Sequence, residues 1–333
     1  MLRTALRPVS VPIAACILAG GISLGCGARE TPAKRGAGCP EPSASAPTAD
    51  RDPSRDSTRI VLDLIDTTRS TPAIPSRAAL PCRILPTEIR FPTRAIGQLP
   101  LIVVAHGLDG DPSSLALLLD TWSRAGYVVA APRFPTTKKD PSGSSLPSES
   151  VEQARDMSFV IDQMLALGAD TTTGPLRGRV DGHHIGAAGM SLGGLTVYGL
   201  ISNTCCRDRR VGAAVLLAAV RRQFIDDHYE DNRAPVLLIQ GDADPGYHNS
   251  ATAYPELVAP KWFITLRGAN HSPPFEVPPG LHAPVAYATT TAFWDRYLKL
   301  DDAAAHRIVA LVAASSGQAC VRYEVAPSHA SEK

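Results

Sequence analysis

Residues 185–195 read Ile-Gly-Ala-Ala-Gly-Met-Ser-Leu-Gly-Gly-Leu, and this segment is the strongest indication of the fold in the sequence. Its first four residues form a short apolar run, which is typical of a buried strand, and the small and apolar residues from Leu192 onward favour a helix. Between the two lies the pattern Gly-x-Ser-x-Gly, with Ser191 at its centre. A strand-to-helix turn this tight strains the backbone of the serine and pushes its hydroxyl outward.

The glycines on either side of Ser191 support this interpretation. A Cβ at Gly189 or Gly193 would collide with the neighbouring strand or helix. The same turn would direct the Leu192 N–H and the helix N-terminus toward a negative charge that forms on a substrate. The alternative is a glycine-rich turn with an incidental serine, so the pattern has to be tested against the rest of the chain.

Composition excludes several classes of function. The chain has 333 residues, of which 44% are hydrophobic and 20% charged, as in a globular protein with one sizeable α/β domain and additional segments. Lysine and arginine number 33 against 32 aspartates and glutamates, and no block of like charge occurs. Nothing here indicates nucleic-acid binding or electrostatic docking on a membrane. Aromatic residues make up only 5%, which argues against a stacking platform for bases or sugars.

The first 57 residues are predicted to lie outside the folded domain. Residues 1–26 have the basic start and apolar centre of a secretory signal, and they end in Ser-Leu-Gly-Cys, which resembles a bacterial lipobox. We therefore expect lipidation of Cys26 and membrane anchoring in the periplasm or cell envelope; an ordinary signal and a secreted protein are the alternative. Residues 27–57 are rich in proline, alanine and serine without apolar periodicity, as in a disordered linker.

Seven cysteines occur, and two of them belong to the signal. Export would place the other five in an oxidising compartment, where disulfides form. Because five is odd, at least one thiol stays free or pairs between chains. Adjacent Cys205 and Cys206 are expected not to bridge each other, and one of them is expected to bond to Cys320 or Cys82. The fifth is Cys39.

No metal site is predicted. The sequence has no Cys-x-x-Cys pair and no histidine cluster with metal-ligand spacing. His183 and His184 are adjacent, but they are expected to precede a strand and to form a surface pair.

Residues 58–325 alternate between strand and helix patterns, which predicts an α/β fold with a doubly wound, mostly parallel sheet. In such sheets the functional loops follow the carboxyl ends of the strands. Strands are predicted at residues 60–65, 82–91, 99–105, 127–131, 185–189, 211–219, 236–241, 262–266 and 319–325, and helices at 112–125, 148–167, 192–200, 283–300 and 303–313.

Three residues that follow predicted strands form a candidate catalytic triad. A serine hydroxyl becomes a nucleophile when a histidine takes its proton and a carboxylate orients that histidine. The chain order Ser191, Asp244, His271 is the order of α/β-hydrolases. Asp242 is the alternative acid, because it comes directly after its strand.

Two further histidines are rivals for the base. His248 lies too near the proposed acid in the same loop, and His282 begins a helix. A serine, an acid and a base at one sheet edge predict an acyl-transfer reaction that calls for no cofactor.

The loop after the strand that ends at Ala105 is expected to complete an oxyanion hole. We predict that the Leu108 N–H is one donor and the Leu192 N–H the other. Gly107 would let the backbone approach the substrate closely. His106 is expected to brace this loop rather than to transfer protons.

A run of ordered motifs resembles the dienelactone-hydrolase-like branch of the α/β-hydrolases, which is related to platelet-activating-factor acetylhydrolases and more distantly to cutinase-like polyesterases. The resemblance covers roughly residues 60–300 and implies the α/β-hydrolase fold and hydrolysis of carboxylic esters by Ser191, His271 and Asp244. The motifs are Asp-Thr-Thr-Arg at 66–69, Ile-Arg-Phe-Pro at 89–92, Leu-Ile-Val-Val-Ala-His-Gly-Leu at 101–108, Gly-Tyr-Val-Val-Ala-Ala-Pro at 126–132, Arg-Asp-Met-Ser-Phe-Val-Ile-Asp at 155–162 and Gly-Met-Ser-Leu-Gly-Gly at 189–194.

Departures from these relatives narrow the expected substrate. Dienelactone hydrolases use a cysteine nucleophile where Ser191 stands here, and polyesterases carry an aromatic residue where Leu108 stands. The segment between residues 219 and 236 is too short for the large lid domain of lipases. We expect an open cleft for small or short-chain esters, with the proline-rich residues 273–279 either walling the acyl pocket or forming a surface loop.

Other functions remain open from the sequence. A polyesterase, an acyltransferase or a peptidase or amidase could use the same triad, and a non-catalytic binding module could keep the fold. The alcohol and acyl groups of the substrate and the oligomeric state are not predicted.

Overall fold

The computed structural model describes residues 38–40, 56–138, 140, 142–143, 145–170, 174–220 and 232–325. The expected signal at residues 1–26, the lipidation of Cys26 and most of the expected linker at 27–57 lie outside the described residues. So do residues 221–231 of the segment in which a lid is not expected. These expectations stay predictions.

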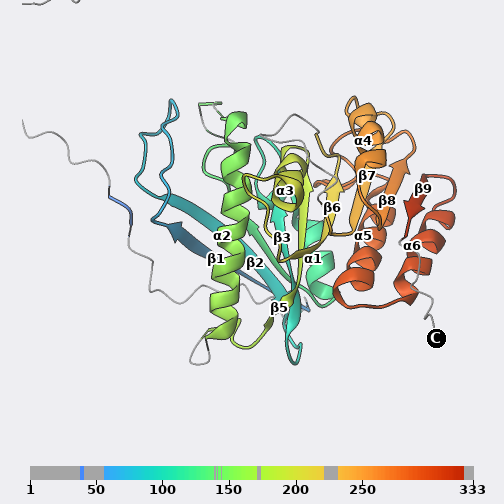
Figure 1. Ribbon diagram of the computed structural model, residues 1–333, viewed down its shortest axis with the longest axis horizontal. Coiled ribbons are helices and arrows are strands. Elements are labelled where there is room, and N and C mark those ends of the chain that lie inside the picture. Colours follow the sequence, from blue (N-terminus) through green and yellow to red (C-terminus); the bar gives the residue numbers. More distant parts are fainter. Residues whose placement is uncertain are drawn as a thin grey trace, which may run out of the picture. The chain divides into compact units, whose positions relative to one another are not determined.

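A mixed sheet of nine strands runs through the described part of the chain, in the order β1-β2-β4-β3-β5-β6-β7-β8-β9 (Figure 1). The six strands from β4 to β8 in this order are parallel, whereas β1, β2 and β9 run antiparallel to their neighbours. The mostly parallel sheet is therefore confirmed. The strands are β1 (Ser57–Asp66), β2 (Arg83–Pro92), β3 (Leu99–Ala105), β4 (Val128–Pro132), β5 (Val180–Met190), β6 (Val211–Leu217), β7 (Val236–Gly241), β8 (Lys261–Leu266) and β9 (Ala319–Glu324).

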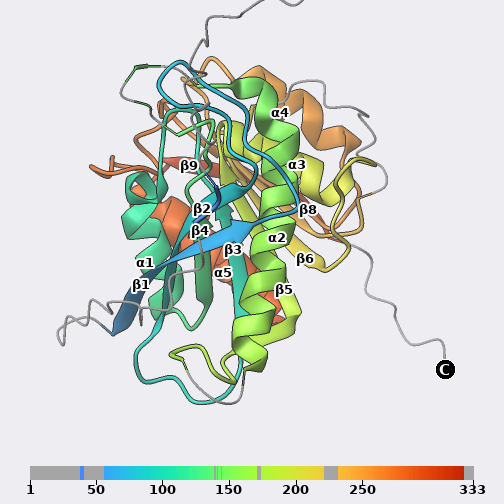
Figure 2. The same ribbon diagram turned by 90° about the vertical axis from the view of Figure 1, so that its left-hand side faces the viewer.

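Helices cover both faces of the sheet, as a doubly wound fold requires. One apolar core joins the sheet to α2, α3 and α4, and a second joins its other face to α1, α5 and α6. Figure 2 shows α1 and α2 on opposite sides of the strands. The helices are α1 (Ala116–Arg124), α2 (Ser150–Ala169), α3 (Leu192–Ser202), α4 (Tyr247–Ala253), α5 (Ala283–Leu298) and α6 (Ala303–Ala313), with short 3₁₀ helices at Pro112–Leu115, Pro147–Glu149 and Tyr254–Glu256.

The apolar sequences of the central strands explain why these residues form a buried sheet. The central parallel strands are continuous apolar runs with both faces buried, such as Leu-Leu-Ile in β7. Within the described ranges, no helix has the length and apolar character needed to cross a membrane.

One prediction about the sheet is wrong. β5 begins at Val180, so His183 and His184 lie inside this strand rather than before it. Its pairing with β3 shifts register, because Pro100 lies opposite Asp181 and the next residue, Leu101, lies opposite Ile185. The polar residues in this bulge hide the strand from an apolar pattern.

The expected cysteine pairing is also wrong. Cys39 bonds to Cys82, and Cys205 bonds to its neighbour Cys206, which leaves Cys320 free. The vicinal pair lies in the turn after α3, and Cys320 lies on the edge strand β9. The vicinal pair follows α3, which comes after β5, whereas Cys320 lies on β9. In the sheet, β6, β7 and β8 lie between β5 and β9.

Candidate active site

Ser191 occupies the strained turn that its sequence context predicts. Its backbone angles are φ 56° and ψ −116°, a left-handed conformation that side-chain-bearing residues seldom adopt. The turn is held against β6, because the Ser191 N–H donates to the carbonyl of Leu217 at 2.9 Å and the Val220 N–H donates to the carbonyl of Ser191 at 3.2 Å. The strain is thus maintained by neighbouring backbone.

Two glycines allow the turn to form. A Cβ on Gly189 would lie 2.0 Å from the carbonyl oxygen of Gly193, and a Cβ on Gly193 would lie 2.2 Å from the carbonyl oxygen of Ala105. Both distances are far shorter than any van der Waals contact. The predicted need for glycine at these positions is therefore confirmed.

Asp244 and His271 meet although 27 residues separate them in the chain. Asp244 follows β7 and His271 follows β8, at the same edge of the sheet as the turn after β5. The Nδ1 atom of His271 lies 2.6 Å from the Oδ2 atom of Asp244. Asp244 is buried, whereas 35% of the His271 side chain is exposed. The carboxylate is thus shielded while the imidazole remains accessible to a small molecule.

Gln240 supports this carboxylate and was not singled out in the sequence. Its Nε2 donates to Oδ2 of Asp244, and its Oε1 accepts from the hydroxyl of Ser250 at 2.9 Å. The Gly246 N–H donates to Oδ1 of Asp244 at 2.7 Å, so both carboxylate oxygens are held. The signal in the sequence is a single polar residue in the otherwise apolar strand β7.

The rival residues have other surroundings. Asp242 is exposed, and its Oδ1 accepts from the Gly268 N–H at 2.6 Å, so it joins the loops after β7 and β8 rather than contacting His271. His282 donates from Nε2 to the carbonyl of Arg267 at 2.8 Å. His248 is exposed on α4, a helix that the polar sequence of this segment did not predict.

The loop after β3 is braced by a buried histidine. The Nδ1 of His106 donates to the carbonyl of Gly107 at 2.8 Å, and its Nε2 accepts from the Phe134 N–H at 3.1 Å. Burial lowers the pKa of His106 to about 4, so the imidazole is neutral near pH 7 and can serve as donor and acceptor at once. These contacts agree with the expected bracing role.

The same loop passes directly beside the strained turn. A Cβ on Gly107 would lie 3.3 Å from the Cβ of Ser191. Leu108 is exposed, and Asp109 has φ 58° while its N–H donates to the carbonyl of Thr137 at 2.8 Å. On the other side, Leu192 is the first residue of α3, and the first amides of a helix have no carbonyl partner within it. The loop after β3 and the first turn of α3 thus flank Ser191.

The proline-rich loop at residues 273–279 is anchored to the rest of the fold. Phe275 is fully buried, and its carbonyl accepts from the hydroxyl of Tyr287 at 3.2 Å. The Val277 N–H donates to the carbonyl of Ser114 at 2.9 Å. The loop is therefore a fixed part of the surface that follows His271, and its role as a wall of the acyl pocket stays a prediction.

No group of three or more His, Cys, Asp or Glu side chains in the described ranges has the arrangement to hold a metal ion.

Comparison with known families identifies the protein at the level of its fold and reaction class. The family model described as PETase, PET hydrolase-like, matches residues 86–301, which extend from β2 to the turn between α5 and α6 and include Ser191, Asp244 and His271. No curated protein matches the chain. The expected relationship to α/β-hydrolase esterases is confirmed. The chain belongs to the PET hydrolase-like family and is an ester hydrolase of the α/β-hydrolase fold.

Proposed function

We propose that this protein is a serine carboxylic ester hydrolase in which Ser191 is the nucleophile, His271 the general base and Asp244 the residue that orients the base. The 2.6 Å contact between Nδ1 of His271 and Oδ2 of Asp244 is the observation that carries the proposal. A carboxylate at Nδ1 keeps the proton on that nitrogen and leaves Nε2 as the basic one. The strained turn at Ser191 gives independent support, since such strain recurs at nucleophiles.

The reaction follows from these roles. The Oγ of Ser191 attacks the ester carbonyl while Nε2 of His271 takes its proton. The resulting oxyanion accepts hydrogen bonds from the Leu108 and Leu192 N–H groups, and the leaving alcohol receives the proton as the C–O bond breaks. Water, activated by the same histidine, then releases the acid and regenerates Ser191.

Small or short-chain esters are the proposed substrates. Leu108 follows Gly107, the residue that lies next to Ser191, and it has an exposed aliphatic side chain where the related polyesterases carry an aromatic one. Polyester hydrolysis is the second candidate, and the family match favours it. Rates on p-nitrophenyl esters of increasing acyl length, compared with soluble products released from a polyester film, separate the two. Activity that falls with acyl length and releases nothing from the film supports small esters.

The proposed nucleophile is tested by Ser191→Ala assayed on p-nitrophenyl acetate. Loss of the nucleophile should lower kcat by about 10⁶-fold. A fluorophosphonate probe should label the wild-type protein with one equivalent and leave the variant unlabelled. Ser202→Ala is the matched control, because Ser202 is buried on the same helix and donates to the carbonyl of Tyr198 at its far end. Undiminished hydrolysis by the Ser191 variant would refute the proposal.

A further inference from the structure

A buried side-chain amide links the two backbone segments that flank Ser191. Gln153 lies in the first turn of α2 and is fully buried. Its Oε1 accepts from the hydroxyl of Thr196 at 2.6 Å, and its Nε2 donates to the hydroxyl of Thr137. Both threonines are also fully buried. The three side chains form one continuous hydrogen-bonded bridge.

Each end of this bridge is joined to one half of the proposed oxyanion hole. The carbonyl of Thr137 accepts the Asp109 N–H at 2.8 Å, and Asp109 directly follows Leu108 and has φ 58°. The hydroxyl of Thr196 also lies 3.2 Å from the carbonyl of Leu192, one helical turn earlier. The amide of Gln153 therefore connects the peptide units around Leu108 and Leu192.

We infer that Gln153 is a positioning residue, which sets the separation of the Leu108 and Leu192 N–H groups and so the geometry of the oxyanion hole. The inference rests on the proposed function, because it assigns those two amides to the transition state. Gln153 does not contact the substrate. It acts through Thr137 on one side and Thr196 on the other.

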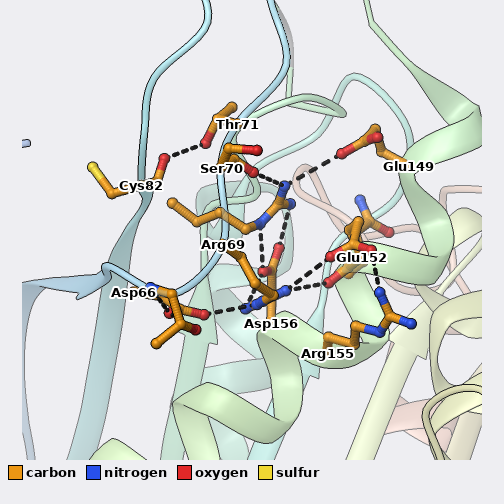
Figure 3. A network of polar contacts seen from close by, with 12 residues as sticks. Asp66, Arg69, Ser70, Thr71, Cys82, Glu149, Glu152, Arg155 and Asp156 are labelled. Atoms are coloured by element: carbon orange, nitrogen blue, oxygen red, sulfur yellow. Dashed lines mark hydrogen bonds and ion pairs between the residues drawn. The ribbon is translucent and has the colours of Figure 1, made fainter. Parts of the chain in front are cut away.

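The helix that carries Gln153 is itself held in place by buried charges (Figure 3). Asp156, three residues further on, accepts from the Nε and Nη2 atoms of Arg83 on β2, both at 2.7 Å, and neither side chain is exposed. Arg69 adds ion pairs to Asp156 at 2.8 Å and to Glu152 at 3.2 Å. A fixed support of this kind lets a hydrogen bond transmit position to the loop and the helix.

Packing of the core alone does not require a glutamine at position 153. An amide buried without partners destabilises the folded state, whereas an apolar side chain of similar length would fill the space without that penalty. The amide is useful only if both of its hydrogen bonds are made. Because the two hydrogen bonds lead to the peptide groups next to the Leu108 and Leu192 N–H groups, the structure favours a role in catalysis over packing alone.

The experiment compares Gln153→Met, which keeps the length of the side chain but loses both hydrogen bonds, with the wild-type enzyme on p-nitrophenyl acetate. We expect kcat to fall about 10-fold or more while KM changes less than about twofold, since donors shifted from the oxyanion weaken binding of the transition state alone. The affinity for phenylboronic acid, which forms a tetrahedral adduct with a serine hydroxyl, should fall by a similar factor. As the pH is lowered, the ratio of kcat in Gln153→Glu to kcat in the wild type at the same pH should rise, because a protonated carboxyl can donate and accept at the same two positions.

A matched pair of threonine variants tests the bridge with less risk to folding. Thr196→Val removes one end of the bridge, and Thr289→Val removes an equally buried hydroxyl on α5 that donates to the carbonyl of Val285 at 2.7 Å, away from the site. We expect only Thr196→Val to lower kcat and boronate affinity. Unchanged kcat in both Gln153→Met and Thr196→Val, or equal losses in Thr196→Val and Thr289→Val, would overturn the inference. If Ser191→Ala is inactive in that case, the proposed function stands and only the role of Gln153 fails.

Discussion

The imidazole of His106 shows at the scale of one residue how burial selects a chemical state. It is a donor to the carbonyl of Gly107 and an acceptor from the Phe134 N–H, a pattern that only the neutral imidazole can satisfy. A proton added at Nε2 would face a backbone N–H in a site without water access. Burial lowers the pKa of His106, and this effect outweighs the hydrogen bond to the carbonyl of Gly107, which by itself raises the pKa.

This state makes stability depend on pH. The pKa of His106 is about 4 in the folded protein and about 6.5 in an unfolded chain, so between these values only the unfolded chain binds the proton. The neutral His106 contributes fully to the free energy of unfolding above about pH 6.5. As the pH falls toward 4, this free energy decreases by about 3 kcal/mol in total. Urea unfolding of the wild type and of His106→Gln across pH 4–7 measures it. The difference in unfolding free energy between the two proteins should shrink on acidification, and a constant difference would contradict the assignment.

Residue types and spacing predicted much of the candidate site at this scale. The turn at Ser191 and its two glycines follow from neighbours in the chain. Asp244 was predicted as the acid and Asp242 as the alternative, but the hydrogen bond to His271 depends on how two loops from different strands meet. Gln240 and Gln153 were not predicted, because a lone glutamine in an apolar pattern is not distinctive without its partners.

At the scale of secondary-structure elements, α2 combines two kinds of buried face. The predicted apolar side of this helix contributes Met157, Val160 and Ile161 to the core. Gln153 and Asp156 are also buried on this helix, and their side chains form hydrogen bonds with polar residues of other segments. The periodicity of the sequence predicted the helix, while its buried polar residues reveal what it positions.

The buried ion pair between Asp156 and Arg83 should contribute far more to the free energy of unfolding than the exposed pair between Arg155 and Glu152. Asp156→Ala would leave the guanidinium of Arg83 buried without its bidentate partner, at a cost of about 4 kcal/mol in unfolding free energy. Arg155→Ala removes an ion pair to Glu152 in which 45% of the Arg155 side chain is exposed, and it should cost less than about 1 kcal/mol. Figure 3 labels Asp156 and the exposed pair of Arg155 and Glu152. Urea denaturation of the two variants makes the comparison, and equal losses would show that burial of the Arg83 pair is unimportant.

At the scale of the whole molecule, the two disulfides constrain the chain very differently. Cys39 and Cys82 are 43 residues apart, and their bond ties the chain before the sheet to the start of β2. Cys205 and Cys206 are neighbours, so their bond closes almost no loop. A crosslink stabilises a fold chiefly by restricting the unfolded chain, and this effect grows with the length of the loop.

The double variant Cys39→Ser/Cys82→Ser should therefore lower the unfolding free energy by about 3 kcal/mol, whereas Cys205→Ser/Cys206→Ser should change it by less than about 1 kcal/mol. Calorimetry of both double variants and of the oxidised wild type measures these differences in unfolding free energy. A larger loss from the vicinal pair would mean that it supports the fold through packing against Leu192 and Leu195 rather than through chain entropy.

Features that depend on neighbouring residues along the chain were predictable without coordinates. Periodicity and turn residues are local, so they predicted the strands, most helices, the parallel sheet and the strained serine. The tertiary structure alone decided which distant groups meet, because those contacts depend on strand order, register and helix docking. The Asp244–His271 bond, the bridge through Gln153, the cysteine pairing and the place of His183 within β5 all depend on this long-range geometry.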